Sequence, residues 1–110
     1  MTDFGLLQKH REIINTIFRN YPLISKVVVY GSRAMGTYKP GSDIDMTLFS
    51  EEDVPFETLT KIIGEFDDSD LPYLVDISLY SKLTNENLIE HIERVGKIIY
   101  EKGIVPIGNW

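Results

Sequence analysis

Hydrophobic and polar positions follow two different patterns along this chain, one with helical spacing and one of short apolar runs. From Asp3 to about Asn20 the apolar residues recur every three or four positions, which predicts an amphipathic helix. Tyr21-Pro22 ends this helix, because proline cannot continue it and restricts the residue before it. The next segment, 23–30, contains three consecutive valines and is apolar on both faces. Such a run is typical of a central strand that is covered on both sides.

The rest of the chain shows the same two patterns. They predict a short helical turn over 32–35, strands over 42–49 and 73–80, and a helix over 56–66. A last helix is predicted from Asn85, with an apolar stripe that continues to Ile99 and a stop at Gly103. The predicted order is α-β-(short α)-β-α-β-α. It describes a single α/β (α+β) domain over residues 1–110, with a small mixed sheet and helices packed on it.

Composition narrows the possible functions. The 110 residues include 17 acidic and 11 basic side chains, a formal net charge of -6, and no cysteine. A disulfide framework, a thiolate nucleophile and a cysteine-based zinc site are therefore excluded. An acidic surface disfavours direct binding to nucleic acid or an anionic membrane, and no apolar run reaches the ~18–20 residues of a membrane span. We expect a soluble, cytoplasmic protein with little room for a separate substrate-binding domain.

Three aspartates interrupt the apolar pattern of the predicted strands. Asp43 and Asp45 stand two residues apart, so alternation along a strand places both on the same face. Asp76 lies within an apolar run of the next strand, where an unpartnered carboxylate would be costly to bury. If the two strands are neighbours, the three carboxylates repel one another, and a hard divalent cation such as Mg²⁺ would relieve that repulsion. The three residues are therefore candidate metal ligands.

Gly31 and Ser32 follow the valine-rich strand directly. Glycine has no side chain, so a phosphate could approach the backbone here, and the serine hydroxyl stands at the start of the predicted helical turn. Such a turn suits the β- and γ-phosphates of a nucleotide. A phosphate turn at the end of one strand, beside metal-binding carboxylates on the next, is the arrangement that nucleotidyl transfer requires.

The spacing Gly-Ser, ten residues, Asp-x-Asp resembles the signature of the DNA polymerase β-like nucleotidyltransferase superfamily. The chain is also similar to the stand-alone minimal nucleotidyltransferases (the MNT type) of that superfamily over four strings, which are 31–36, 42–45, 71–78 and 91–96. The resemblance runs from the first helix to about Gly103 and implies the nucleotidyltransferase fold. Met35 stands where many relatives carry a basic residue, so an extra phosphate contact at that position is not implied.

The resemblance also implies a role for each candidate residue. Asp43 and Asp45 would hold two Mg²⁺ ions, with Asp45 bridging them. Asp76 would bind the catalytic ion and help to deprotonate the attacking hydroxyl, while Gly31 and Ser32 would hold the triphosphate of ATP. Proteins of this type are antitoxins that assemble with a HEPN-domain ribonuclease toxin and transfer AMP from ATP to a tyrosine of that toxin. The resemblance therefore implies a Mg²⁺-dependent protein adenylyltransferase in a hetero-oligomer.

Other interpretations stay open from the sequence. The chain could neutralise a toxin by binding alone, with its acidic surface against a basic ribonuclease, or it could transfer a nucleotide to a small molecule. Arg33 could contact phosphate or form a structural ion pair. Tyr38 and Lys39 are expected in an exposed loop, where they could also contact the nucleotide. His10 and His91 are expected on helices far from the motif, in surface or packing roles.

Two kinds of segment lie outside the motif that carries the candidate site residues. The acidic clusters 51–53 and 67–70 are expected to be solvated turns. The apolar C-terminal residues 104–110 could pack on the chain's own core or contact a partner.

Overall fold

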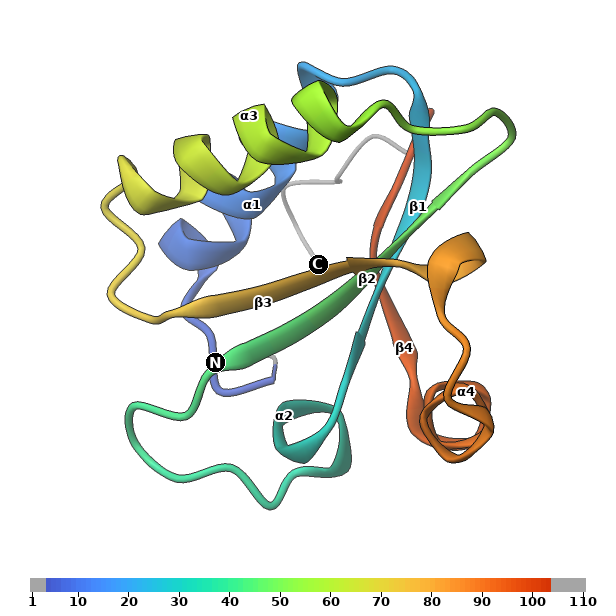
Figure 1. Ribbon diagram of the computed structural model, residues 1–110. Helices are drawn as coiled ribbons and strands as arrows, with labels where there is room; N and C mark the ends of the chain where they lie inside the picture. The colour runs from blue at the N-terminus through green and yellow to red at the C-terminus, as the bar shows by residue number, and fades with distance from the viewer. Residues whose placement is uncertain (1–3, 104–110) are drawn as a thin grey trace.

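The computed structural model describes residues 4–103. Its helices and strands are, in order, α1 (Gln8–Arg19), β1 (Ile24–Tyr30), α2 (Ser32–Met35), β2 (Ile44–Ser50), α3 (Phe56–Asp67), β3 (Val75–Leu79), the 3-10 helix η1 (Tyr80–Lys82), α4 (Glu86–Val95) and β4 (Lys97–Glu101). The strands form one sheet in the order β3-β2-β1-β4 (Figure 1). β2 and β3 run parallel, whereas the other neighbours run antiparallel. The sheet is therefore mixed, as predicted.

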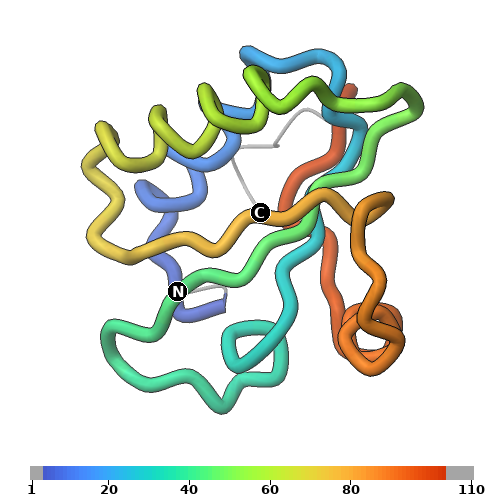
Figure 2. The backbone as a smooth tube through the Cα atoms, in the orientation of Figure 1, coloured from blue at the N-terminus to red at the C-terminus, as the bar shows by residue number. Residues whose placement is uncertain are grey.

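β1 is an inner strand that is covered on both faces, as its valine run predicts. Val27 and Val29 are buried in the larger hydrophobic core under α1 and α3. Val28 and Tyr30 instead pack with Ile92 of α4 in a second, smaller core. The backbone trace shows the same layers, with α1 and α3 on one side of the sheet and α4 on the other (Figure 2). Alternation along a strand therefore assigns each residue of β1 and β2 to one of two covered faces.

The chain after Val95 is a strand, so the prediction of a helix that continues to Ile99 and stops at Gly103 is wrong. α4 ends at Val95, and β4 pairs antiparallel with β1. Gly96 marks the change, because its backbone is extended and a Cβ there would overlap Cγ1 of Val28 on β1. The chain leaves the helix at this close approach and continues along β1, where Ile99 is buried in the larger core.

The other boundaries lie close to their predicted places. α1 begins at Gln8 rather than near Asp3, and Nδ1 of His10 accepts the N–H of Leu7 at its start. Asn85 caps α4, because its side chain accepts a backbone N–H from the first turn of that helix. The C-terminal residues 104–110 lie outside the described residues. Within residues 4–103, no helix is both long enough and apolar enough to cross a membrane.

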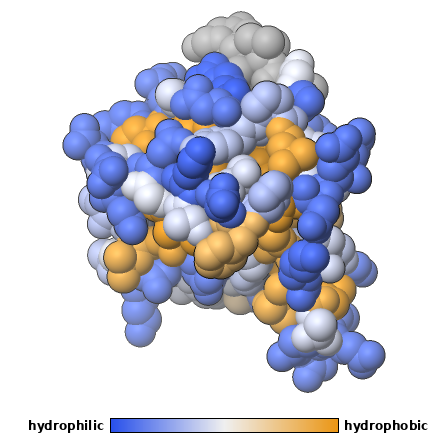
Figure 3. Space-filling model, turned by 45° about the horizontal axis from the view of Figure 1, so that its top comes forward, coloured by the Kyte–Doolittle hydropathy of each residue, from blue (hydrophilic) through white to orange (hydrophobic). Residues whose placement is uncertain are grey.

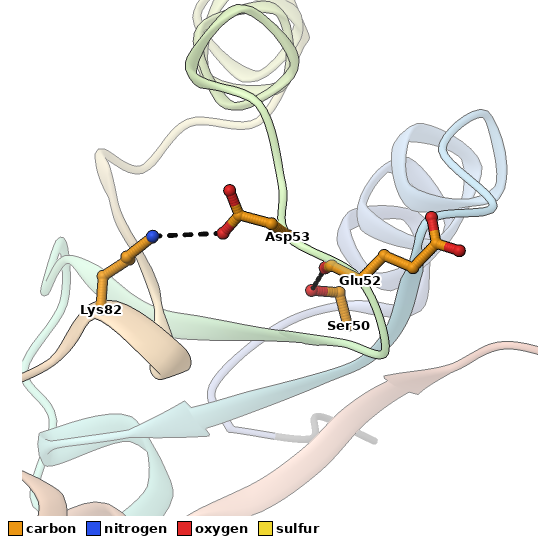
Figure 4. A network of polar contacts seen from close by, with 4 residues as sticks. All are labelled: Ser50, Glu52, Asp53 and Lys82. Carbon is orange, nitrogen blue, oxygen red and sulfur yellow. Dashed lines mark hydrogen bonds and ion pairs between the residues drawn. The ribbon is translucent and has the colours of Figure 1, made fainter.

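The acidic segment after β2 is a turn exposed to solvent, as predicted. Asp53 forms an ion pair with Lys82 of η1, with 3.1 Å between Nζ and Oδ1, and Ser50 Oγ donates to the carbonyl oxygen of Glu52 at 2.6 Å (Figure 4). Both charged side chains of the pair are more than 60% exposed, so it adds little stability. The aspartates of segment 67–70, which begins with the last residue of α3, are exposed as well.

Hydrophilic side chains dominate the face shown in Figure 3, with apolar patches between them. Phe56 at the start of α3 and Leu74 just before β3 are 80% and 74% exposed. Most other large apolar side chains of residues 4–103 are at least partly buried. The fold is thus a thin sheet with a core on each face, and the polar site described below lies at one end of β2.

Candidate active site

Asp45 and Asp76 lie side by side on the two parallel strands. Asp45 of β2 is the register partner of Asp76 of β3. The neighbours of both aspartates along their strands belong to the core under α1 and α3, so the aspartates themselves lie on the α4 face. Burial, followed by the negative charges of Asp76 and Asp43, raises the pKa of Asp45 above its ordinary value. The two carboxylates thus share one patch, as the sequence predicted for neighbouring strands.

Asp43 stands just before β2 and is exposed, yet it is close enough to act electrostatically on Asp45. Within residues 4–103, no three acidic or histidine side chains form a preformed metal-binding site. Mg²⁺ does not require one, because it keeps several waters and is usually held by one or two carboxylates together with substrate phosphates. The repulsion by Asp76 and Asp43 adds to the effect of burial on the pKa of Asp45, and a cation would remove this repulsive part. The donor set at this end of β2 therefore fits Mg²⁺.

Gly31 joins β1 to α2 in a conformation that favours glycine. Its φ is 73° and its ψ is -152°, a region that residues with a side chain rarely adopt. A Cβ on Gly31 would also overlap Oδ2 of Asp45. Glycine is needed here so that the turn can pack directly against a candidate metal ligand. The sequence predicted a close approach to the Gly31 backbone, and within the chain the approaching group is this carboxylate.

Ser32 is the first residue of α2, the single helical turn that the sequence predicted at 32–35. Its side chain is partly buried. The turn is closed by the N–H of Met35, which donates to the carbonyl oxygen of Gly31 at 3.1 Å. Ser32 thus follows Gly31 at the end of β1, beside the strand that carries Asp45, because Tyr30 is the register partner of Asp45.

Arg33 is 2% exposed and holds the loop that leads to the aspartates. Its Nε and Nη2 donate to the carbonyl oxygen of Ser42 at 3.0 and 2.6 Å, and its Nη1 donates to the carbonyl oxygen of Phe4 at 2.9 Å. The guanidinium also stacks over the ring of Tyr73, 4.3 Å from its centre. These contacts with backbone and an aromatic ring correspond to neither of the two roles considered from the sequence. Arg33 instead fixes Ser42, the residue before Asp43.

His91 lies beside the motif, so the prediction that placed it far away is wrong. Its Nε2 accepts the N–H of Gly31 at 3.3 Å, and its ring packs edge-on against Tyr30. A positive charge on this ring would lower the pKa of Asp45, the opposite of the effect of the aspartates. No local signal could reveal this, because the contact joins residues 60 positions apart and depends on how α4 packs on the sheet. His10 has the predicted packing role, and burial lowers its pKa.

The loop between α2 and β2 carries the two remaining residues that the sequence singled out. Tyr38 is 36% exposed and lies over the guanidinium of Arg33, with 5.5 Å from its ring centre to that group. Lys39 is exposed, and its backbone N–H donates to Ser42 Oγ at 2.8 Å. The expectation of an exposed loop is confirmed for both.

The arrangement brings together the parts that phosphoryl chemistry needs. One end of β2 and β3 presents carboxylates that can hold a hard cation, and the end of β1 presents a turn with a backbone that a ligand could approach. Asp76 is exposed, so an incoming hydroxyl group could reach its carboxylate. These groups come from three neighbouring strands, which fixes their spacing.

Comparison with known proteins agrees with this geometry. The family described as "Polymerase beta, Nucleotidyltransferase" matches residues 12–104 of the chain. The chain is 34% identical over 105 residues to "Probable protein adenylyltransferase MntA" of Haemophilus influenzae. That match covers 93% of this chain and 91% of the relative.

Solved structures share the fold at lower identity. A toxin-antitoxin complex with AMP-PNP superposes with a TM-score of 0.69 at 18% identity, over 84% of this chain and 74% of that chain. A tri-AMPylated HEPN toxin of Shewanella oneidensis in complex with MNT antitoxin gives a TM-score of 0.64 at 17% identity, over 86% of this chain and 72% of that chain. The predicted nucleotidyltransferase fold is confirmed.

Proposed function

Because this chain belongs to the polymerase β nucleotidyltransferase family, we propose that it transfers AMP from ATP to a tyrosine of a HEPN-domain ribonuclease toxin and so acts as the antitoxin. The observation that carries the proposal is the pairing of Asp45 and Asp76 beside the Gly31 turn. Two similar proteins support the acceptor and the nucleotide. The relative from Haemophilus influenzae is named a probable protein adenylyltransferase, and one structural neighbour contains an AMPylated HEPN toxin.

The carboxylates would hold the metal in this reaction. Asp43 and Asp45 would hold two Mg²⁺ ions, and Asp76 would help to hold the catalytic ion. Bound Mg²⁺ would supply Lewis-acid stabilisation of the negative charge on the phosphates. The raised pKa of Asp45 is consistent with this assignment: burial is its first cause, and the negative charges of Asp76 and Asp43 add to it.

The proposed step forms a bond between the tyrosine oxygen and the α-phosphorus of ATP. The bond between that phosphorus and the oxygen of the departing pyrophosphate breaks. Asp76 would accept the proton of the tyrosine hydroxyl, since its carboxylate is exposed to an incoming acceptor. Gly31 and Ser32 would hold the triphosphate, with the Ser32 hydroxyl as a hydrogen-bond donor.

Transfer of labelled AMP tests the proposal. The chain is incubated with ATP labelled on the α-phosphate, Mg²⁺ and its cognate HEPN-domain toxin, and label on a toxin tyrosine is measured. Asp43→Asn is expected to lower the rate by about 100-fold or more, because a neutral amide is a poor ligand for Mg²⁺. Asp53→Asn makes the same change of charge at the far end of β2, in an exposed ion pair, and is expected to leave the rate within about twofold.

The same experiment can contradict the proposal. Absence of transfer by the natural chain, or equal transfer by Asp43→Asn, would show that the site does not catalyse this reaction. A double variant, Asp43→Asn with Asp45→Asn, that still neutralises the toxin in cells would favour neutralisation by binding alone.

A further inference from the structure

His91 reaches from α4 to the turn that follows β1. Its Nε2 accepts the Gly31 N–H at 3.3 Å, and its ring centre lies 6.2 Å from that of Tyr30 in an edge-on contact. α4 is fixed on this face of the sheet by Ile92, which packs with Val28 and Tyr30. The helix thus brings a polar side chain to the backbone of the candidate phosphate turn.

The Gly31 N–H needs this acceptor because it lies beyond the sheet. β1 ends at Tyr30, the last residue of the strand that pairs with β2. A partly buried backbone N–H without an acceptor costs about as much free energy as a lost hydrogen bond. Nε2 of His91 accepts only with its lone pair free, so the imidazole is neutral and carries its hydrogen on Nδ1.

Gly31 is therefore held from two sides. His91 holds its N–H, while Oδ2 of Asp45 occupies the space where a Cβ would stand. Rotation of the Gly31 peptide would break the contact with His91 and change the contact with Asp45. His91 thus controls where the backbone leading to Ser32 stands relative to the carboxylates.

We propose that His91 is a positioning residue of the nucleotide site, which holds the Gly31–Ser32 turn in the conformation that receives the triphosphate of ATP. The proposal rests on the proposed function for its ligand, and it extends that function by making α4 part of the site. Since the hydrogen bond of His91 goes to the turn, its loss acts on nucleotide affinity more than on the rate of the bound complex.

Nucleotide binding without any toxin tests this role. The Kd of AMP-PNP with Mg²⁺ is measured for the natural chain and for His91→Phe, which keeps a ring against Tyr30 but has no acceptor. The Kd is expected to rise by about three- to tenfold, the effect of losing one hydrogen bond. His91→Gln carries a side-chain oxygen near the position of Nε2 and is expected to bind within about twofold of the natural chain. Glu90→Gln changes an exposed residue of the same helix that pairs with Arg94, and should leave the Kd unchanged.

A second measurement reads the hydrogen bond itself. Exchange of the Gly31 amide hydrogen with solvent is followed by NMR in each variant, and it is expected to become faster in His91→Phe and to stay slow in His91→Gln. Equal AMP-PNP affinity in His91→Phe and the natural chain would overturn the inference. Equal weakening in His91→Phe and His91→Gln together with a lower unfolding temperature would overturn it too, because that result indicates packing alone. If the natural chain itself binds no AMP-PNP, the proposed function fails and the positioning role fails with it, whatever the exchange of Gly31 shows.

Discussion

At the scale of single residues, the candidate site depends on a missing side chain. Gly31 combines a φ of 73° with a distance to Asp45 that leaves no room for a Cβ. The sequence marked this glycine as a place where phosphate could approach the backbone, and this stays a prediction. It did not indicate the contact with Asp45, because that contact depends on strand register, which cannot be read from the sequence.

Gly31→Ala is expected to reduce AMP transfer and to destabilise the fold. The methyl group would displace the carboxylate of Asp45, and the alanine backbone would be strained, so we expect a loss of about 2 kcal/mol or more in the free energy of unfolding. Transfer rate and urea unfolding are measured in parallel. Gly36→Ala is the matched control, because Gly36 has a φ of 80° but open space around it, and only the smaller backbone cost of about 1 kcal/mol applies. Equal effects of the two substitutions would show that the contact with Asp45 is unimportant.

At the scale of elements, Arg33 joins segments that the sequence could not connect. From α2 it reaches the carbonyl oxygens of Ser42 and Phe4 and stacks on Tyr73, so three separate segments meet around one buried guanidinium. The sequence pattern predicted most of the helices and strands, yet it could not identify the contacts of Arg33. These contacts depend on the path of the loops in the folded chain.

Arg33→Lys is expected to destabilise the chain by about 2–3 kcal/mol. A lysine ammonium lacks the planar fork that serves both carbonyl oxygens, and it leaves buried acceptors without a donor. The free energy of unfolding in urea measures this loss. Arg94→Lys serves as control, since Arg94 forms an exposed ion pair with Glu90 within α4 and should change stability by no more than about 0.5 kcal/mol. An Arg33→Lys chain as stable as the control would contradict the bridging role.

The wrong prediction at the end of α4 has a cause at the same scale. Ile92, Val95 and Ile99 keep helical spacing, so the apolar period alone favours one continuous helix. The run Ile98-Ile99-Tyr100 is equally suited to a strand, and β1 offers an edge for it to pair with. Tertiary pairing decides between the two, with Gly96 at the point of close approach.

At the scale of the whole molecule, the burial of Asp45 beside like charges opposes stability. The pKa of Asp45 is raised in the folded chain, so its ionised form is less favourable there than in the unfolded chain. The charge therefore lowers stability above the folded pKa. This loss fades as the pH falls through the folded pKa, and it is gone below the ordinary value of 3.8.

Asp45→Asn is accordingly expected to raise the unfolding temperature of the metal-free chain at pH 7 by a few degrees, and to give no gain below pH 3.8. Thermal unfolding in a chelator, followed by circular dichroism across pH, measures the difference. Added Mg²⁺ should stabilise the natural chain and narrow the gap, because a cation removes the repulsion. Asp53→Asn, an exposed and ion-paired carboxylate, should show no gain. A metal-free Asp45→Asn chain less stable than the natural one at pH 7 would contradict this account.

The sequence by itself determined the helices and strands up to α4, apart from η1, together with the layered α/β fold and the candidate metal and phosphate residues. These features follow from local periods, from the glycines and prolines that interrupt them, and from the fixed spacing of Gly31-Ser32 and Asp43-x-Asp45. The tertiary structure alone decided that β4 pairs with β1, that Asp45 faces Asp76 in register, and that His91 holds Gly31. Each of these depends on which distant segments pack together, and the hydrophobic pattern within one segment does not specify the segment it packs against.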